Sequence, residues 1–287
     1  MQLTKHHGLG NDFLVVLDGV NGRALAVDGD LARRVCDRRT GIGADGLIHG
    51  ATPEAGSDAD VVMHLYNADG GRAEMSGNGV RCLAHAVVLA AEEREAHLQI
   101  DTDGGRRDVV VRAWDNDGRV AWTEAAMGKV RPGPEVPPSV AARLADPGPG
   151  HAHRYATADV GNPHLVVEVD DPAAIDLHDL GAWIEQQFPE GINVEFVPRA
   201  GNGPVDEIDL RVWERGAGET QACGTGACAV AAVLHDWGVT APPDGEPGAR
   251  LQVHMPGGDA QVRLSGEGEL ALSGDVHLVA TVELPDG

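Results

Sequence analysis

The sequence predicts an α+β fold of two similar domains, each a curled sheet wrapped around one central helix. The main observation is a repeat. Two segments begin with a small polar side chain, Ser76 or Cys223, and continue with Gly-x-Gly and a run of small apolar residues. Such a run is typical of a buried helix. Cys223 lies 147 residues after Ser76, about half of the 287-residue chain, as an internal duplication would place it.

The second observation is the number of short strands. Apolar or alternating runs bounded by turn residues predict strands in both halves of the chain. In the first half these are Gln2–His6, Phe13–Leu17, Val61–Tyr66, Leu98–Asp101, Val109–Ala113 and Val120–Thr123. In the second half they are Tyr155–Val160, Leu165–Val169, Gly191–Val197, Asp209–Trp213, Arg250–His254, Ala260–Leu264, Glu269–Ser273 and Val276–Glu283.

Two central helices are expected among these strands. One continues after Gly79 to about Glu95, and the other spans Ala227–Trp237, with Gly238 in the position that commonly ends a helix. Shorter helices are predicted at Leu31–Arg38, capped by Asp28 or Asp30, at Ser139–Leu144 and at Leu177–Phe188.

The proline-rich segment 128–150 is the best candidate for a crossing between domains. The first domain is therefore predicted to span residues 1–125 and the second residues 126–274. The last strand, within 275–287, is expected to return to the first domain.

The composition argues against several classes of function. The formal net charge of −23 disfavours a nucleic-acid-binding surface. No apolar run approaches the roughly 18 residues of a membrane span, and the N-terminus lacks the apolar segment of a signal peptide. The chain is expected to be cytoplasmic, with neither a membrane nor a nucleic acid as partner.

The four cysteines have different expected roles. Their spacing gives no zinc pattern, so no metal site is predicted. Cys36, Cys82 and Cys228 lie within predicted helices and are assigned to the core. Cys223 lies where a glycine-rich turn opens a helix, whose free N–H groups favour a thiolate and can bind a carboxylate. Such a site could lower the pKa of this thiol from roughly 8.5 towards neutrality; a buried structural cysteine is the alternative.

Two helix starts of this kind could bind one carboxylate from both sides, with Ser76 and Cys223 on opposite faces of its α-carbon. No pyridoxal site is evident to act as an electron sink, so the protein itself would stabilise an enolate-like transition state. Other glycine-rich segments, around Asn11 and at Thr40–Gly46, are more simply turns than ligand sites when each is considered alone. The second lacks the Lys-Ser or Lys-Thr of a P-loop.

Five motifs together resemble the diaminopimelate epimerases, cofactor-independent enzymes of the wider proline-racemase-like superfamily. The resemblance extends over essentially the whole chain, and the last motif, continued through Ala222–Gly226, is highly specific. They are Lys5–Phe13, Asn67–Gly70, Gly77–Arg81, Gly161–His164 and Glu214–Thr220. The resemblance implies two domains of like fold with the substrate, diaminopimelate, between them. One cysteine would remove the α-proton while another delivers a proton to the opposite face, without a cofactor.

The resemblance also assigns the site residues. Cys223 matches the second catalytic cysteine, and His164 and Glu214 would lie near the thiols and influence their protonation. The backbone of Gly77 and Asn78 and of Gly224 and Thr225 would hold the reacting α-carboxylate. The remaining contacts with the substrate would come from Asn11, Asn67, Asn162, Asn193, Glu214 and Arg215.

Position 76 departs from the family pattern, because Ser76 stands where the first catalytic cysteine is usual. A hydroxyl is far less acidic than a thiol, and the sequence supplies no obvious base to activate it. Cys82 matches an ordinarily non-catalytic cysteine and is no substitute. Gly46 stands where some members have a ligand-side glutamine, which is the milder change.

The main expectation is an epimerase that interconverts LL- and meso-diaminopimelate for lysine and peptidoglycan precursors, with Ser76 as a weak partner or a relay to water. A related epimerase, racemase or one-base lyase acting on another amino acid is an alternative. An impaired or engineered variant and a non-enzymatic binding protein are further alternatives. The oligomeric state is open, with a homodimer as one alternative.

Overall fold

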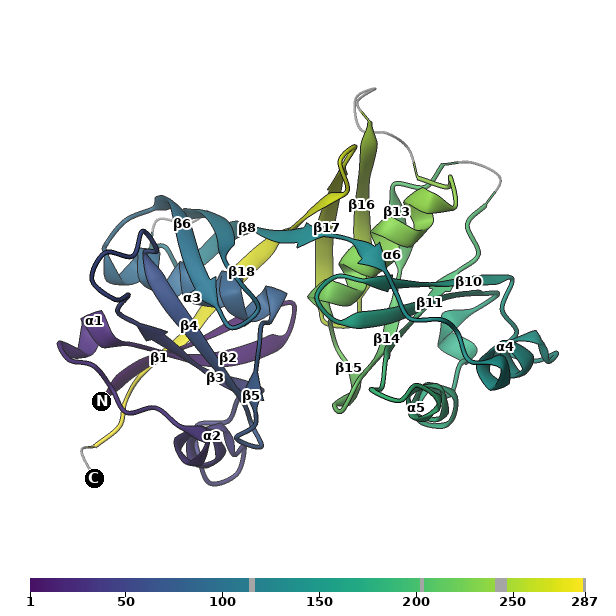
Figure 1. Cartoon of the computed structure of the whole chain (residues 1–287). Helices are drawn as coiled ribbons and strands as arrows, with labels where there is room; N and C mark the ends of the chain where they lie inside the picture. Colours follow the sequence, from purple (N-terminus) through teal and green to yellow (C-terminus); the bar gives the residue numbers. More distant parts are fainter. Residues whose placement is uncertain (114–116, 202–203, 241–246, 286–287) are drawn as a thin grey trace. The chain divides into compact units, whose positions relative to one another are not determined.

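The computed structural model describes residues 1–113, 117–201, 204–240 and 247–285. The chain divides into two compact units, one of Met1–Ala126 with Ser273–Gly287 and the other of Met127–Leu272. Each unit combines sheets with one long buried helix, which confirms the α+β class (Figure 1). Among the described residues, no helix has both the length and the apolarity to cross a membrane.

The first unit is a closed ring of strands around α3 (Gly77–Ala90). The hydrogen-bonded order is β1-β2-β3-β4-β6-β7-β8-β18, and β1 also pairs with β18. Helix α3 contacts β1, β2, β3, β4, β6 and β7, so nearly all of its residues are buried. The strands are β1 (Gln2–Gly8), β2 (Asn11–Leu17), β3 (Gly46–Ala51), β4 (Val61–Asn67), β6 (Glu95–Thr102), β7 (Arg107–Ala113), β8 (Val120–Lys129) and β18 (Glu269–Glu283).

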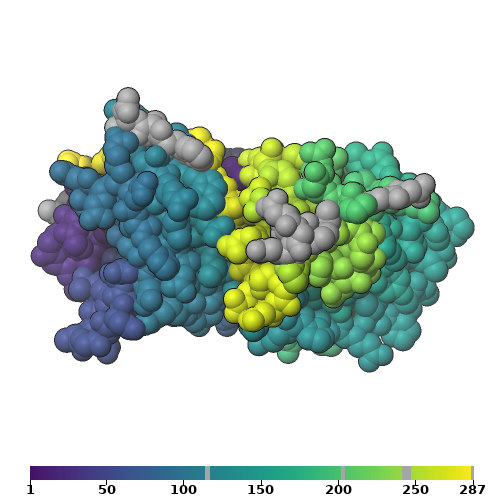
Figure 2. Space-filling view, turned by 90° about the horizontal axis from the view of Figure 1, so that it is seen from above, coloured from purple at the N-terminus to yellow at the C-terminus, as the bar shows by residue number. Residues whose placement is uncertain are grey.

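Smaller elements complete this unit: α1 (Asp18–Asn21), α2 (Gly29–Cys36) and β5 (Arg72–Ala73), which pairs with β4. The predicted cap of α2 is confirmed as Asp28, whose carboxylate accepts a hydrogen bond from Leu31 N at 2.8 Å. Figure 2 shows one face of this unit, on which blue and teal segments are prominent.

The second unit surrounds α6 (Gly224–Asp236), which contacts β10, β11, β12, β16 and β17. Its six-stranded sheet has the order β15-β14-β12-β11-β10-β9, and β13, β16 and β17 continue from β18. The strands are β9 (Arg131–Pro132), β10 (Arg154–Asp159), β11 (Pro163–Val169), β12 (Asn193–Pro198), β13 (Glu207–Asp209), β14 (Arg211–Glu214), β15 (Gly218–Thr220), β16 (Gly248–Met255) and β17 (Gly258–Ser265).

The other face of the six-stranded sheet packs on α4 (Pro138–Ala145) and α5 (Leu177–Gln187), beside the short helix η1 (Pro172–Ala174). Leu165 and Val167 of β11, and Val194 and Phe196 of β12, belong to this apolar cluster. Because side chains alternate along a strand, the residues between them, including Glu195, point to the face that α6 covers.

The strand registers repeat between the units. In the first unit β2 and β3 are parallel, with Val15 opposite Ile48, and Ile48 lies opposite Leu65 of β4. In the second unit β11 and β12 are parallel, with Val166 opposite Glu195, which lies opposite Val212 of β14. Ile48 and Glu195 are therefore counterparts, separated by the same 147 residues as Ser76 and Cys223.

Several expected boundaries were wrong. The first central helix ends at Ala90, not near Glu95, because Glu92 adopts a left-handed φ of 57° and Glu95 begins β6. The two strands expected after Glu269 form one, β18, whereas the one expected at Asp209–Trp213 is divided between β13 and β14. Strand β3 was missed, since its glycine-rich approach suggested only a turn. The expected end of the second central helix is confirmed: Gly238 has φ 71° and donates to His235 O.

The core of the first unit contains a buried pair of histidines whose Nδ1 atoms lie 3.3 Å apart, His6 and His85. Burial and the neighbouring rings lower the pKa of His6 to about 3. Folding therefore excludes a proton that the unfolded chain binds near pH 6.5. The contribution of His6 to the free energy of unfolding is complete above that pH and is lost as the pH falls towards 3. We expect the unfolding free energy to drop by about 2 kcal/mol from this group between pH 7.5 and pH 5.

Denaturant titrations at the two pH values would measure that drop. His6→Gln should make the dependence shallower, whereas His97→Gln, at an exposed histidine, should leave it unchanged. An equally steep dependence in His6→Gln would contradict the assignment.

Candidate active site

The first half of the site is the start of α3. Ser76 is the N-cap of this helix, and its Oγ accepts a hydrogen bond from Gly79 N at 3.1 Å. Asn78, in the first turn, is buried and accepts from Arg81 Nη2 at 2.6 Å. The predicted helix start at this serine is therefore confirmed, with its hydroxyl used as a cap.

The predicted asparagines of this unit differ in their environment. Asn11, at the start of β2, donates to Asp45 Oδ2 at 2.8 Å, and its Oδ1 lies 3.5 Å from Asn78 Nδ2. Asn67 ends β4 with an exposed side chain. Gly46 begins β3 in a tight place, where a Cβ would lie 2.8 Å from Tyr66 O, so a glutamine would require the neighbouring strand to shift.

The second half of the site is the start of α6, which has the same local geometry. Cys223 is the N-cap, and its Sγ accepts from Gly226 N at 3.3 Å. Thr225 Oγ1, in the first turn, lies 3.4 Å from the sulfur. The side chain is almost entirely buried, with 4% of the residue exposed. The N–H groups of Gly224 and Thr225 lie in this first turn, where a carboxylate could bind.

A buried histidine–glutamate pair lies beneath this helix start. His164 and Glu195 are both fully buried, and His164 Nδ1 lies 2.7 Å from Glu195 Oε1. The other ring nitrogen, Nε2, lies 2.9 Å from Asn162 Oδ1. A Cβ at position 226 would lie 2.8 Å from Glu195 Oε1, so only Gly226 leaves room for the carboxylate there.

Glu214 lies beside Cys223, at the end of β14. Its Oε1 accepts a short hydrogen bond from Thr220 Oγ1, and the Cys223 thiol is also a hydrogen-bond partner. Burial raises the pKa of the Glu214 carboxyl above its ordinary value, because its effect is larger than the lowering of the pKa by these hydrogen bonds. A carboxyl with a raised pKa, in contact with a thiol, is suited to exchanging a proton with it.

Asn193 and Arg215 are brought together by the fold. Asn193 is buried, donates to Pro163 O at 2.9 Å and accepts from Arg215 N at 2.9 Å. This amide therefore holds the chain after β14 in place. Arg215 is more exposed, and its Nη1 donates to Glu190 O at 3.1 Å.

The expected lowering of the thiol pKa of Cys223 is wrong for this structure. Burial raises that pKa well above its ordinary value, and the carboxylates of Glu214 and Glu195 raise it further. The hydrogen bonds from the helix start and from Thr225 oppose these effects but are smaller. Loss of water around the sulfur therefore outweighs the favourable position at the helix end.

The three other cysteines are buried, which confirms their assignment to the core. Burial raises the pKa of Cys36 to about 11 and that of Cys82 to about 12. Among the described residues, no group of acidic, histidine and cysteine side chains has the arrangement of a metal site.

The repeat also pairs the site residues of the two units. Strand registers pair Phe13 with Gly46 in one unit and His164 with Asn193 in the other. Five positions correspond, and in each pair the first unit carries a side chain that does not titrate near neutral pH. The pairs are Asn11 and Asn162, Phe13 and His164, Ile48 and Glu195, Asn67 and Glu214, and Ser76 and Cys223.

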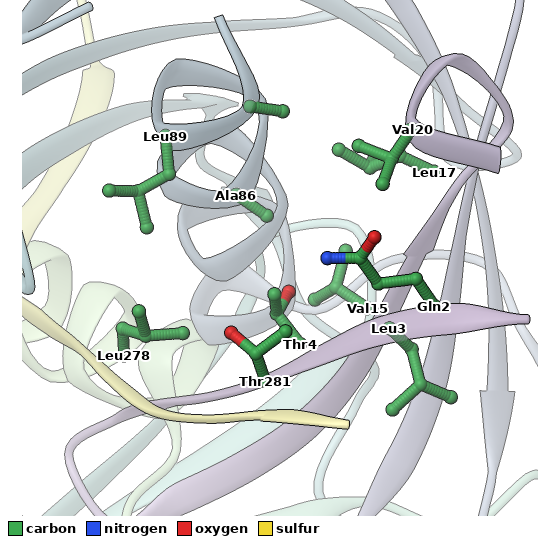
Figure 3. A pocket seen from close by; sticks show the side chains of 11 residues that line it. Gln2, Leu3, Thr4, Val15, Leu17, Val20, Ala86, Leu89, Leu278 and Thr281 are labelled. Atoms are coloured by element: carbon green, nitrogen blue, oxygen red, sulfur yellow. The ribbon is translucent and has the colours of Figure 1, made fainter. Parts of the chain in front are cut away.

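A pocket in the first unit lies away from these residues (Figure 3). It is lined by the ends of β1, β2 and β18 and by the last turn of α3, where Leu89 points into it. Leu89 is 12 residues along the helix from Gly77, or roughly 18 Å at 1.5 Å per residue. This largely apolar pocket is therefore no part of the candidate site.

Glu195 and Thr220 are the site residues that sequence reasoning missed. The sequence places Glu195 in a predicted strand, two residues after Asn193, and assigns it no role. The signal available was a charged residue within an apolar strand, in which charge is rarely buried without a partner.

The family model for diaminopimelate epimerase matches residues 3–131 and 156–279. The chain belongs to the diaminopimelate epimerase family. This confirms the resemblance predicted from the five motifs. The chain is 38% identical to the diaminopimelate epimerase of Pseudomonas entomophila, over 97% of this chain and 99% of that one. It is 40% identical to that of Thermosynechococcus vestitus, over 92% and 91%.

Solved structures share the fold of this diaminopimelate epimerase family member at low sequence identity. A PhzF-family phenazine biosynthesis protein of Bacillus anthracis has a TM-score of 0.72 at 14% identity, covering 100% of this chain and 99% of that one. A hydroxyproline epimerase of Agrobacterium vitis, solved with trans-4-hydroxy-L-proline, has a TM-score of 0.66 at 18% identity, covering 99% and 90%. These likenesses support the fold alone.

Proposed function

We propose that this protein is an amino-acid epimerase that interconverts LL- and meso-diaminopimelate without a cofactor. The observation that carries the proposal is the start of α6, where the Cys223 thiol caps a helix and contacts the Glu214 carboxyl, in a chain of this family. A thiol beside a proton acceptor, at a helix end suited to a carboxylate, is the apparatus that α-proton transfer needs.

In the proposed reaction, the Cys223 proton first passes to the Glu214 carboxylate, leaving a thiolate. The thiolate then takes the α-proton, and the electron pair of the broken C–H bond remains on the substrate as an enolate-like anion. The N–H groups of Gly224 and Thr225 would stabilise the charge that develops on the carboxylate. Reprotonation on the same face returns the starting isomer, and reprotonation on the other face inverts the centre.

The second face belongs, in this proposal, to the start of α3. Ser76, Gly77 and Asn78 would meet the same α-carbon and carboxylate, as the counterparts of Cys223, Gly224 and Thr225. Ser76 would act as a weak acid or as a relay to water. Asn11, Asn67, Asn162, Asn193, Glu214 and Arg215 would hold the substrate, Asn193 partly by fixing the backbone of Arg215.

The setting of this function is also proposed. Diaminopimelate is an intermediate of lysine and peptidoglycan precursor biosynthesis, so we place the protein in the cytoplasm. A homodimer is the assembly we would test first, by light scattering on the purified protein.

Incubation with LL-diaminopimelate in D₂O tests the proposal. Deuterium uptake at the α-carbon and formation of the meso isomer should both be detected, with uptake ahead of inversion. If the folded protein gives neither deuterium uptake nor meso product with either isomer, diaminopimelate is not the substrate.

A one-base reaction on an amino acid is the second candidate. The specific observation in its favour is that Ser76, Ile48 and Phe13 supply no titrating group in the first unit at the counterpart positions of Cys223, Glu195 and His164. Such an enzyme would exchange the α-proton of one stereoisomer and yield no inverted product.

Arg215→Met is expected to weaken substrate binding by roughly 2–5 kcal/mol, because one charged end of the substrate loses its charge-assisted partner. Steady-state kinetics should show a raised KM. Arg211→Met is the matched control at the start of the preceding strand, since Arg211 donates to Pro172 O and pairs with Glu219. It should lower stability and leave KM unchanged. An unchanged KM in Arg215→Met would refute the role of Arg215.

A further inference from the structure

Glu195 has no role in the reaction as derived above, yet its burial lowers the stability of the folded protein. It is fully buried, its Oε1 lies 2.7 Å from His164 Nδ1, and its Oε2 makes no hydrogen bond to any residue that the structure describes. A buried carboxylate with an unsatisfied oxygen destabilises a fold, so its presence here calls for a functional explanation.

A chain of polar contacts leads from this carboxylate to the reactive sulfur. His164 presents Nδ1 to Glu195 and Nε2 to Asn162 Oδ1, 2.9 Å away. Asn162 Nδ2 lies 3.5 Å from Thr225 Oγ1, which lies 3.4 Å from Cys223 Sγ. Both ring nitrogens therefore point at oxygen acceptors, and the amide hydrogens of Asn162 are directed towards the start of α6.

The other unit keeps the geometry but not the chemistry. At the counterpart of Gly226, a Cβ built on Gly79 would meet Met63 Cε at 3.2 Å and Ile48 Cδ1 at 3.3 Å. At Gly226 the corresponding contact is Glu195 Oε1. The same turn of the repeat thus has apolar atoms behind Ser76 and a carboxylate behind Cys223.

We propose that Glu195 is a positioning residue that acts through His164 and fixes both the imidazole ring and the Asn162 amide. In this proposal, Glu195 restricts acid–base chemistry to the second unit. Glu195 accepts the Nδ1 hydrogen of His164, and the second ring hydrogen of the imidazolium form, on Nε2, is donated to Asn162 Oδ1. The amide oxygen is then held inward and its N–H groups face the carboxylate-binding turn. This rests on the proposed function for its effect on turnover, but its structural part does not.

The charges around the sulfur fit this assignment. Burial raises the pKa of Cys223 most, Glu214 raises it further, and Glu195 adds a smaller effect of the same sign, while the charge of His164 lowers the pKa of Glu214. Hydrogen bonds from Gly226 N and Thr225 face the sulfur from its own helix and lower its pKa. Glu195 thus adds to the effects of burial and of Glu214, which favour the protonated thiol.

The first test uses the unaltered protein labelled with ¹⁵N-histidine. The chain has 13 histidines, and the signals of His164 are assigned by their loss in His164→Gln. Nδ1 of His164 should carry a proton and donate a hydrogen bond to the Glu195 carboxylate. An unprotonated Nδ1 would overturn the proposal, whatever the substrate of the enzyme.

The second test measures alkylation of Cys223 by iodoacetamide against pH, without substrate. Glu195→Gln should move the profile to lower pH by roughly one unit or more, since a like charge near the sulfur is removed. Glu195→Asp should stay close to the parent. Glu168→Gln is the matched control, because it removes a buried carboxylate of the same sheet that binds Arg154 instead. Its profile should be unchanged, although its melting temperature falls.

The third test is α-deuterium exchange. Glu195→Gln should lower the exchange rate by at least about 10-fold with little change in KM and with a shifted pH profile, and Glu195→Asp should restore part of the rate. A loss of stability alone, with the alkylation and exchange profiles unmoved, would overturn the proposal. If no protein variant exchanges diaminopimelate, the proposed substrate is wrong, and the labelling and alkylation results still decide the role of Glu195.

Discussion

Cys223→Ser is expected to abolish deuterium exchange with both stereoisomers of diaminopimelate. The hydroxyl should still cap α6, because Ser76 caps α3 in the same way, accepting from Gly79 N at 3.1 Å where Cys223 accepts from Gly226 N at 3.3 Å. The fold is therefore preserved while the acidic group is lost. One acid–base group contributes typically 10²–10⁴-fold, so exchange should fall by at least that range.

Mass spectrometry of the substrate recovered from D₂O measures this loss, and a thermal melt checks the fold. Cys228→Ala is the matched control, since Cys228 is buried in the same helix and is no part of the site. It should reduce stability and keep exchange. Exchange that survives in Cys223→Ser within a few-fold would show that another group removes the α-proton.

Ser76→Cys is expected to raise the rate of inversion by roughly 10²-fold or more. In the protein as it stands, the isomer that presents its α-proton to Cys223 should exchange faster than it inverts, because the anion regains a proton mostly from the side that lost one. The opposite isomer should exchange very slowly. A thiol at position 76 would supply the missing partner on the second face.

The ratio of inverted product to deuterium uptake, followed for both isomers, measures the effect. The introduced thiol would lie near Ile48 and Met63 rather than beside a buried carboxylate, so it should be alkylated at lower pH than Cys223. Cys82→Ser controls for a change of thiol content in the same helix, and should leave the ratio unaltered. If Ser76→Cys has no effect because the parent already inverts at full speed, then another group, such as water held by His164, delivers the second proton.

The sequence by itself determined the repeat, the two helix starts and the family. These follow from local chemistry: Ser76 and Cys223 each precede Gly-x-Gly, and the run of small apolar residues after each is typical of a buried helix. The cap of α2 at Asp28 and the end of α6 before Gly238 are local in the same sense. They were predicted because the residues that decide them are neighbours in the chain.

The tertiary structure alone decided the pairing of His164 with Glu195. These residues are 31 positions apart, and only the parallel pairing of β11 with β12 places them on the face that α6 covers. The same is true of the missed strand β3, whose partners β2 and β4 both lie at a distance in the sequence. A pattern of single residues contains no information on such contacts.

The protonation of Cys223 was also decided by tertiary structure. Its place at a helix N-terminus, visible in the sequence, favours a thiolate, but burial and two carboxylates from β12 and β14 reverse the balance. The physical reason is that a helix end contributes only a partial charge, whereas removing water from a sulfur anion and placing carboxylates beside it act on the full charge. That comparison depends on what surrounds the sulfur, which is settled only when the strands and the helix are packed together.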